Sequence, residues 1–148
     1  MNTTATPESC TDACNSLLRG ELSAIETYQQ ALEKFRGDTA EGALQQILAE
    51  HGENARLIRE HILSMDGGEP ATDSGAWGAF AKAVEGTAKL FGESAALKAL
   101  QEGEEHGINE YEDALESDDV MEEMKDLIRA RFIPVLTRHI RQLEALRA

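Results

Sequence analysis

Apolar residues recur every three or four positions along four long stretches of this 148-residue chain. Such spacing is typical of amphipathic helices, each of which buries one face. The stretches fall into two pairs, at residues 11–66 and 93–148, and only a short turn separates the members of each pair. Short connections place consecutive helices side by side and antiparallel. The pattern therefore predicts an all-α, antiparallel four-helix bundle built from two helical hairpins.

Three other segments interrupt or extend this pattern. Residues 67–92 carry Trp77 and Phe80 at helical spacing and predict a short crossover helix between the hairpins. We interpret these two aromatic residues as core anchors, with an exposed dimer contact as the alternative. The polar residues 1–10 predict a disordered tail ahead of a single domain at residues 11–148. Pro134 removes a helical hydrogen bond, so we expect the last helix to be kinked or split near Arg131 to Pro134.

Two segments of the chain repeat each other. Residues 20–33 (GELSAIETYQQALE) and 103–116 (GEEHGINEYEDALE) share Gly, Glu, Ile, Tyr, Ala, Leu and Glu in the same register. Each copy places a glutamate two helical turns before a tyrosine, so the two side chains share the apolar face. A buried carboxylate costs several kcal/mol unless a charged or hydrogen-bonding group meets it. The repeat therefore predicts a partner for Glu21 and Glu104.

The second helix of each hairpin offers a histidine as that partner. His51 and His139 both lie on the apolar stripe of their helices, each three residues after a leucine. A bundle would then receive one polar group from each helix, and two carboxylates with two neutral imidazoles suit iron or zinc. The candidate metal ligands are Glu21, His51, Glu104 and His139, with Tyr28 and Tyr111 as hydrogen-bond donors behind them and Glu50 and Glu53 as further candidate ligands.

The helix lengths leave a metal-free alternative open. Counted from the turn near Ser117, His139 lies roughly 13 Å further along its helix than Glu104 if that helix is straight, whereas Arg131 lies nearer the same level. Glu104 could then pair with Arg131, and a tyrosine could hold Glu21. In this arrangement the same polar residues form a buried network without metal.

Segments LLRGELSAIETYQQAL and LKALQEGEEHGINEYEDAL resemble the ferritin-like superfamily. Within this superfamily the chain is similar to small four-helix-bundle proteins classified as a domain of unknown function, and more distantly to bacterioferritin and rubrerythrin. The resemblance implies a bundle that binds iron. Di-iron members carry Glu-x-x-His on the second and fourth helices. If His51 and His139 align with the family's histidines, Leu48 and Leu136 stand where the family has its glutamates. If His51 and His139 align with the family's glutamates instead, Asn54 and Gln142 stand where the family has its histidines.

Charge and chain composition exclude some classes of binding partner and indicate a compartment. Acidic residues outnumber basic ones 28 to 14, and the formal net charge of -14 disfavours nucleic acid and anionic membranes. No apolar run is long enough to span a bilayer, and the amino terminus does not resemble a secretory signal, which predicts a cytoplasmic protein. We expect Cys10 and Cys14 to be free and partly exposed, and His61 and His106 to lie at the surface.

These observations favour a ferritin-like bundle protein that holds iron or zinc through inward Glu and His residues. The missing bridging glutamates allow at most weak ferroxidase activity. The alternative is a non-catalytic structural or stress-associated bundle protein, which could act as a homodimer.

Overall fold

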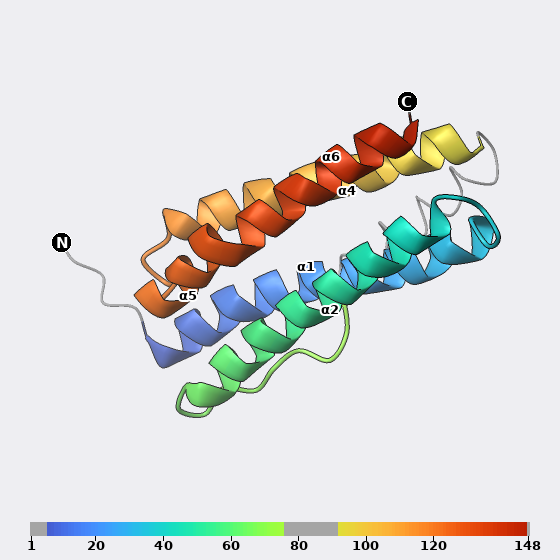
Figure 1. The fold of residues 1–148 in the computed structure, drawn as a ribbon. Coiled ribbons are helices and arrows are strands. Elements are labelled where there is room, and N and C mark those ends of the chain that lie inside the picture. The colour runs from blue at the N-terminus through green and yellow to red at the C-terminus, as the bar shows by residue number, and fades with distance from the viewer. Residues whose placement is uncertain (1–5, 76–91, 148) are drawn as a thin grey trace.

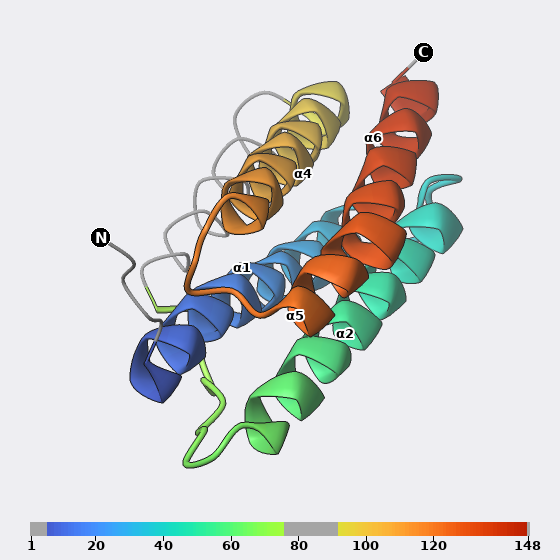
Figure 2. The same cartoon turned by 90° about the vertical axis from the view of Figure 1, so that its left-hand side faces the viewer.

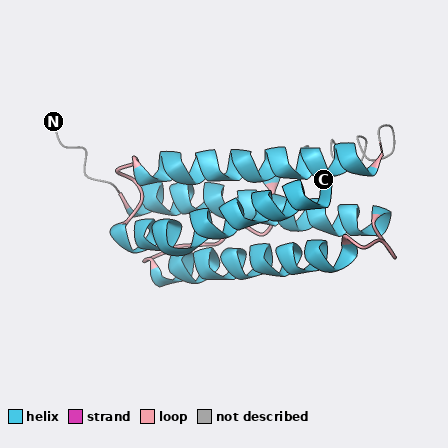
Figure 3. Ribbon diagram, turned by 45° about the horizontal axis from the view of Figure 1, so that its top comes forward, coloured by secondary structure: helices cyan, strands magenta, loops and turns pink. Residues whose placement is uncertain are grey.

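The computed structural model describes residues 6–75 and 92–147, and this part of the chain contains helices and short connections but no strand (Figures 1 and 3). The fourth helix of the bundle is continuous but is made of three consecutive segments. In chain order the elements are α1 (Pro7–Lys34), α2 (Glu41–Ser64), α4 (Glu93–Leu115), α5 (Glu122–Leu127), the π-helical segment η2 (Ile128–Phe132) and α6 (Ile133–Arg147).

The helices form two hairpins that pack into a bundle. Helix α1 runs along α2, and α4 runs along α6, while α1 also contacts α4 across the middle (Figures 1 and 2). The predicted antiparallel four-helix bundle is confirmed. The predicted crossover helix, including Trp77 and Phe80, lies largely at residues 76–91, outside the described residues. None of the described helices has the length and apolar character that a membrane span requires.

The first helix begins earlier than the sequence pattern indicated. Thr6 caps α1 by accepting a hydrogen bond from the backbone N–H of Ser9, whose hydroxyl in turn accepts from the Thr6 N–H. Proline at the first helical position fits this start, because its missing N–H would have no helical partner there. The prediction of a disordered tail through residue 10 is therefore wrong from Pro7 onward.

Helix α1 also buries both cysteines. Cys10 and Cys14 are free and buried, where we expected partial exposure. Burial, reinforced by Cys10, raises the pKa of the Cys14 thiol to about 11. A thiol in this state is a poor nucleophile, so a redox-sensing role for Cys14 is disfavoured.

The last helix is irregular where Pro134 led us to expect a kink. In η2 the N–H of Ile133 bonds to the carbonyl of Ile128, five residues back, instead of four. Such a π-helical turn inserts one extra residue into the helix. Pro134, which cannot donate a backbone hydrogen bond, follows directly in α6. The irregularity thus takes the form of a π-helical turn within a continuous helix.

Two apolar clusters fill the bundle, and a polar layer separates them. One cluster gathers around Leu18, Ile58 and Phe132, and the other around Leu44 and Leu97. On all four helices the inward glutamate or histidine lies in sequence between residues of the two clusters. The packing of both clusters thereby holds the polar side chains at one level of the bundle.

Candidate functional site

The polar layer brings together the four side chains that the sequence singled out. Glu21 of α1, His51 of α2, Glu104 of α4 and His139 of α6 are each no more than 3% exposed. Their mutual contacts make one continuous hydrogen-bonded network inside the bundle.

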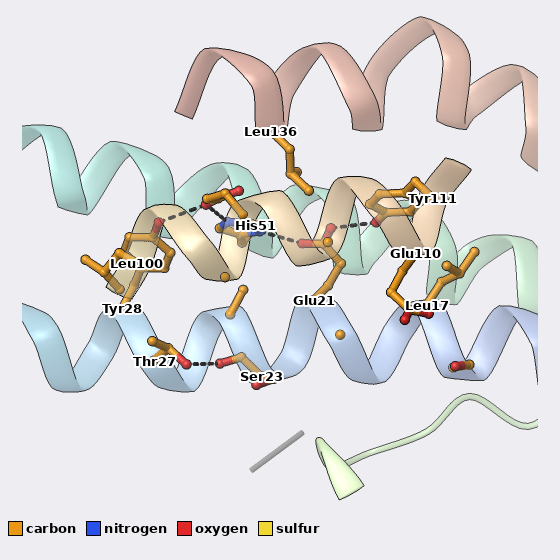
Figure 4. A pocket seen from close by; sticks show the side chains of 16 residues that line it. Leu17, Glu21, Ser23, Thr27, Tyr28, His51, Leu100, Glu110, Tyr111 and Leu136 are labelled. Atoms are coloured by element: carbon orange, nitrogen blue, oxygen red, sulfur yellow. Dashed lines mark hydrogen bonds and ion pairs between the residues drawn. The ribbon is translucent and has the colours of Figure 1, made fainter. Parts of the chain in front are cut away.

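His51 lies between the two glutamates of the repeat. Its Nδ1 lies 2.6 Å from Oε2 of Glu21, and its Nε2 lies 2.6 Å from Oε1 of Glu104. Burial lowers the pKa of His51, but the charges of Glu104 and Glu21 outweigh burial and raise this pKa to about 10. Both ring nitrogens of His51 face a carboxylate oxygen (Figure 4), and the raised pKa favours a proton on each nitrogen, so that both donate.

His139 connects the network to the bundle surface. Its Nδ1 lies 3.1 Å from Oε1 of Glu104, and its Nε2 lies 2.9 Å from Oε1 of Glu50. The second oxygen of Glu50 forms an ion pair with Arg138. Glu50, one of the two further candidate ligands, thus belongs to the network. Glu53 does not, because it pairs with Arg56 at the surface.

The tyrosines cross between the repeats. Tyr28 donates to Oε1 of Glu104 over 2.8 Å, and Tyr111 donates to Oε1 of Glu21 over 2.5 Å (Figure 4). Burial, together with the charges of Glu104 and Glu21, raises the pKa of both phenols well above 10, so both remain protonated donors. Each repeat therefore supplies the tyrosine that holds the glutamate of the other.

The two glutamates differ in how fully their oxygens are used. Oε2 of Glu21 meets His51, and Oε1 accepts from Tyr111 and, at 3.4 Å, from Asn54. Oε1 of Glu104 meets Tyr28 and both histidines, whereas its Oε2 is buried without a hydrogen-bond partner among the described residues. Burial raises the pKa of Glu104, but His51 and His139 outweigh it and lower this pKa to about 2, so the carboxylate is charged.

Three side chains at this point could hold a metal ion. One ligand atom each from His51, Glu104 and His139 lies within 4.8 Å of the other two. A cavity of about 50 Å³ between α1 and α4 adjoins His51 and Glu104, which is room for an ion or a few water molecules. The glutamates and tyrosines of the two repeats line this cavity, as do Gly20, Gly103 and Gly107. Figure 4 shows Glu21, Tyr28 and Tyr111 around it. A side chain at Gly107 would come within 2.9 Å of Leu136, so glycine permits this close helix packing.

The metal-free arrangement that we considered from helix lengths is half right. Tyr111 does hold Glu21, but Arg131 donates to Oδ1 of Asn54 instead of pairing with Glu104. The condition for the offset of roughly 13 Å for His139, one straight last helix, does not hold. The fourth helix starts only at Glu122, after a connection at residues 116–121, and the π-helical turn inserts one more residue. Both features bring His139 back toward the level of Glu104.

Sequence reasoning missed one member of the network, named a second only as the replacement of a family histidine, and wrongly placed one histidine at the surface. Asn54 is fully buried, and its place one turn after His51 on the same face was the available signal. Arg138 is exposed and gave no signal. His61, expected at the surface, is buried, and its Nε2 has no partner among the described residues. His106 is exposed beside Glu110, as expected.

Comparison with known proteins gives a family without an assigned activity. Neither the curated proteins nor the solved structures contain a match to the chain. The model of one family, described as a domain of unknown function (DUF2383), matches residues 9–117, which include α1 from Ser9 onward, all of α2 and α4, and three of the four central polar residues. The chain therefore belongs to the DUF2383 family.

Proposed function

We propose that this protein binds one divalent transition-metal ion, iron or zinc, through Glu104, His51 and His139. The observation that carries the proposal is the buried Oε2 of Glu104, which has no partner in the described part of the chain although two imidazole nitrogens lie beside the same carboxylate. A buried, charged oxygen without a partner is costly, and a cation would remove that cost.

The outer nitrogens of both histidines support this assignment. In metal sites a ligating histidine commonly donates its second ring N–H to a carboxylate, which orients the ring. Glu21 occupies this position on Nδ1 of His51, and Glu50 occupies it on Nε2 of His139. We therefore assign Glu21 an orienting role, in place of the ligand role expected from the sequence.

The charges of the site also favour a divalent ion. Glu21, Glu50 and Glu104 bring three negative charges to the network, and Arg138 brings one positive charge. With two neutral histidines, a divalent cation makes the group electrically neutral. Neutrality matters because an uncompensated charge inside a bundle is costly.

The resemblance to ferritin-like proteins favours iron, and the mixed nitrogen and oxygen ligands are compatible with zinc as well. A second metal position would need carboxylates that α2 and α6 do not supply at Leu48 and Leu136. We therefore propose a site that holds one metal, with at most weak ferroxidase activity.

A metal-free structural role is the second candidate, and the state of His51 favours it. With a pKa of about 10, His51 is an imidazolium that already compensates the two glutamates. An imidazolium has no free nitrogen for a metal, so the proton and the metal compete for Nε2.

Titration of the chelator-treated protein with Co²⁺ and Zn²⁺, followed by calorimetry and elemental analysis, separates the two candidates. We expect one ion per chain, and loss of that ion in Glu104→Gln. Glu53→Gln is the matched control, because this glutamate is paired with Arg56 at the surface. If the wild type takes up no metal even after reconstitution, including with Fe²⁺ under anaerobic conditions, the metal proposal fails and the structural role stands.

A further inference from the structure

The buried network reaches solvent between α2 and α6. Glu104 and His139 are buried, but the side chain of Glu50 is 22% exposed and that of Arg138 is 48% exposed. Both oxygens of Glu50 are in use, one on His139 and the other on Arg138. Glu50 and the His139 ring therefore lie between solvent and Glu104 on this side of the bundle.

The contact that closes this point is a weak one. Ion pairs at a protein surface contribute little stability, because water solvates the charges and the long side chains lose freedom when they pair. The Arg138 side chain is 48% exposed, so water competes for its guanidinium and the contact with the partly buried Glu50 can open from the Arg138 side. Once it opens, Glu50 presents a free carboxylate oxygen to solvent next to Nε2 of His139.

We propose that Glu50 and Arg138 form the entrance through which a divalent cation reaches and leaves the buried site. The ion pair of Arg138 with Glu50 closes this entrance, and the entrance opens when the pair breaks. This inference rests on the proposed metal binding. A cation from solvent meets Glu50 first, and Arg138 competes with it for the same carboxylate. The Arg138 side chain contacts Glu50 and makes no hydrogen bond or ion pair with the three proposed ligands in the described structure, so it acts on the rate of exchange and not on the final coordination.

The chain contains a matched control for Arg138. Arg141 lies three residues after Arg138 on the same exposed side of α6, and both arginines line one shallow surface groove. It has no ion pair among the described residues. Arg141→Gln removes the same charge from the same region without changing a contact of Glu50, so it measures the general electrostatic effect.

Stopped-flow mixing of the full-length protein with Co²⁺, and of the Co²⁺-loaded protein with excess chelator, gives both exchange rates. We expect Arg138→Gln to raise the association and dissociation rates together, each about three- to tenfold beyond the effect of Arg141→Gln. The dissociation constant, corrected for the same control, should stay nearly constant. Glu50→Gln should slow association about tenfold. Circular dichroism checks that each variant is folded.

Two results would overturn the entrance while leaving metal binding intact. Equal exchange rates in Arg138→Gln and Arg141→Gln would show that Arg138 is an ordinary surface charge. A changed dissociation constant with unchanged association would show that Arg138 positions His139 through Glu50. Failure of the wild type to bind Co²⁺ is a different outcome, because it removes the proposed function itself.

Discussion

The two repeats meet at the polar layer with the same residues but different surroundings. Glu21 and Glu104 occupy corresponding positions, and each accepts a hydrogen bond from the tyrosine of the opposite repeat. Glu21 has partners on both oxygens, including His51 and Asn54. Glu104 gathers its partners on one oxygen, and its other oxygen has no partner within residues 6–75 and 92–147. The two copies of the repeat thus supply one carboxylate whose two oxygens both have hydrogen-bond partners and one carboxylate with an oxygen that can still accept a ligand.

The difference originates in the second helix of each hairpin. His51 reaches both glutamates, whereas His139 reaches Glu104 and turns its other nitrogen outward to Glu50. Glu104 therefore faces two histidines and Glu21 only one. Identical residues in a repeat acquire different chemistry when their neighbours on adjacent helices differ.

Removing His51 should have the largest effect on stability. His51→Leu leaves two buried carboxylates without their shared positive partner, and we expect the free energy of unfolding to fall by about 3–5 kcal/mol. His61→Leu is the control, since His61 is buried with an unpaired nitrogen and an apolar replacement should be nearly neutral. Urea denaturation in the presence of a chelator measures both. Equal losses would mean that the network contributes no special stability.

A change of pH should remove the interaction between His51 and the two glutamates gradually. The folded pKa of His51, about 10, lies above the ordinary value of 6.5. Its contribution is therefore complete below about pH 6.5 and is lost as pH rises toward 10. Glu104 behaves oppositely, because its pKa of about 2 lies below the ordinary 4.5 and its contribution disappears as pH falls from 4.5 toward 2. Denaturation of the metal-free protein from pH 3 to 10 checks both limits; a flat alkaline limb would contradict the charged state of His51.

Metal affinity should separate the two glutamates. Glu104→Gln removes the proposed ligand, and we expect the affinity for Zn²⁺ to fall by more than about 100-fold. Glu21→Gln alters only the group that orients His51, which typically costs about 10- to 100-fold. Calorimetric titration of both variants tests the order. The reverse order would identify Glu21 as the ligand and Glu104 as the support.

Removing either tyrosine hydroxyl should lower the stability of the protein by a similar amount. Tyr28→Phe and Tyr111→Phe each remove one hydrogen bond to a charged carboxylate, worth about 1.5–3 kcal/mol. We expect similar losses in the two variants, because each tyrosine donates to the corresponding glutamate. Thermal unfolding of the single variants and the double variant gives the comparison. A loss confined to one tyrosine would show that the asymmetry extends beyond the histidines.

The sequence predicted the parts of this site that depend on helical periodicity. Glu21 and Tyr28 share a face because they are two turns apart, and His51 points inward because it lies on the apolar stripe. These relations are local, so spacing alone defines them. The same reasoning placed the short turns that make α1 and α2 a hairpin.

Relations between helices were harder to predict. The level at which His139 meets Glu104 depends on where the fourth helix starts and on a π-helical turn, and neither leaves a periodic signal. The partner of Arg131 depends on the rotation of η2 against α2, which decides between Asn54 and Glu104. Arg138 remained unnoticed because exposed arginines are common, and only its contact with Glu50 distinguishes it.

The reactivity of Cys14 in α1 can be used to measure how often one end of the bundle opens. Cys14 is fully buried in the apolar cluster around Leu18 and Ile58, and burial together with Cys10 raises its pKa to about 11. An alkylating reagent can reach this thiol only when the packing around α1 opens. The labelling rate of Cys14 therefore measures how often that end of the bundle opens, and a slower rate after metal addition would show that an ion held at the centre tightens the whole protein.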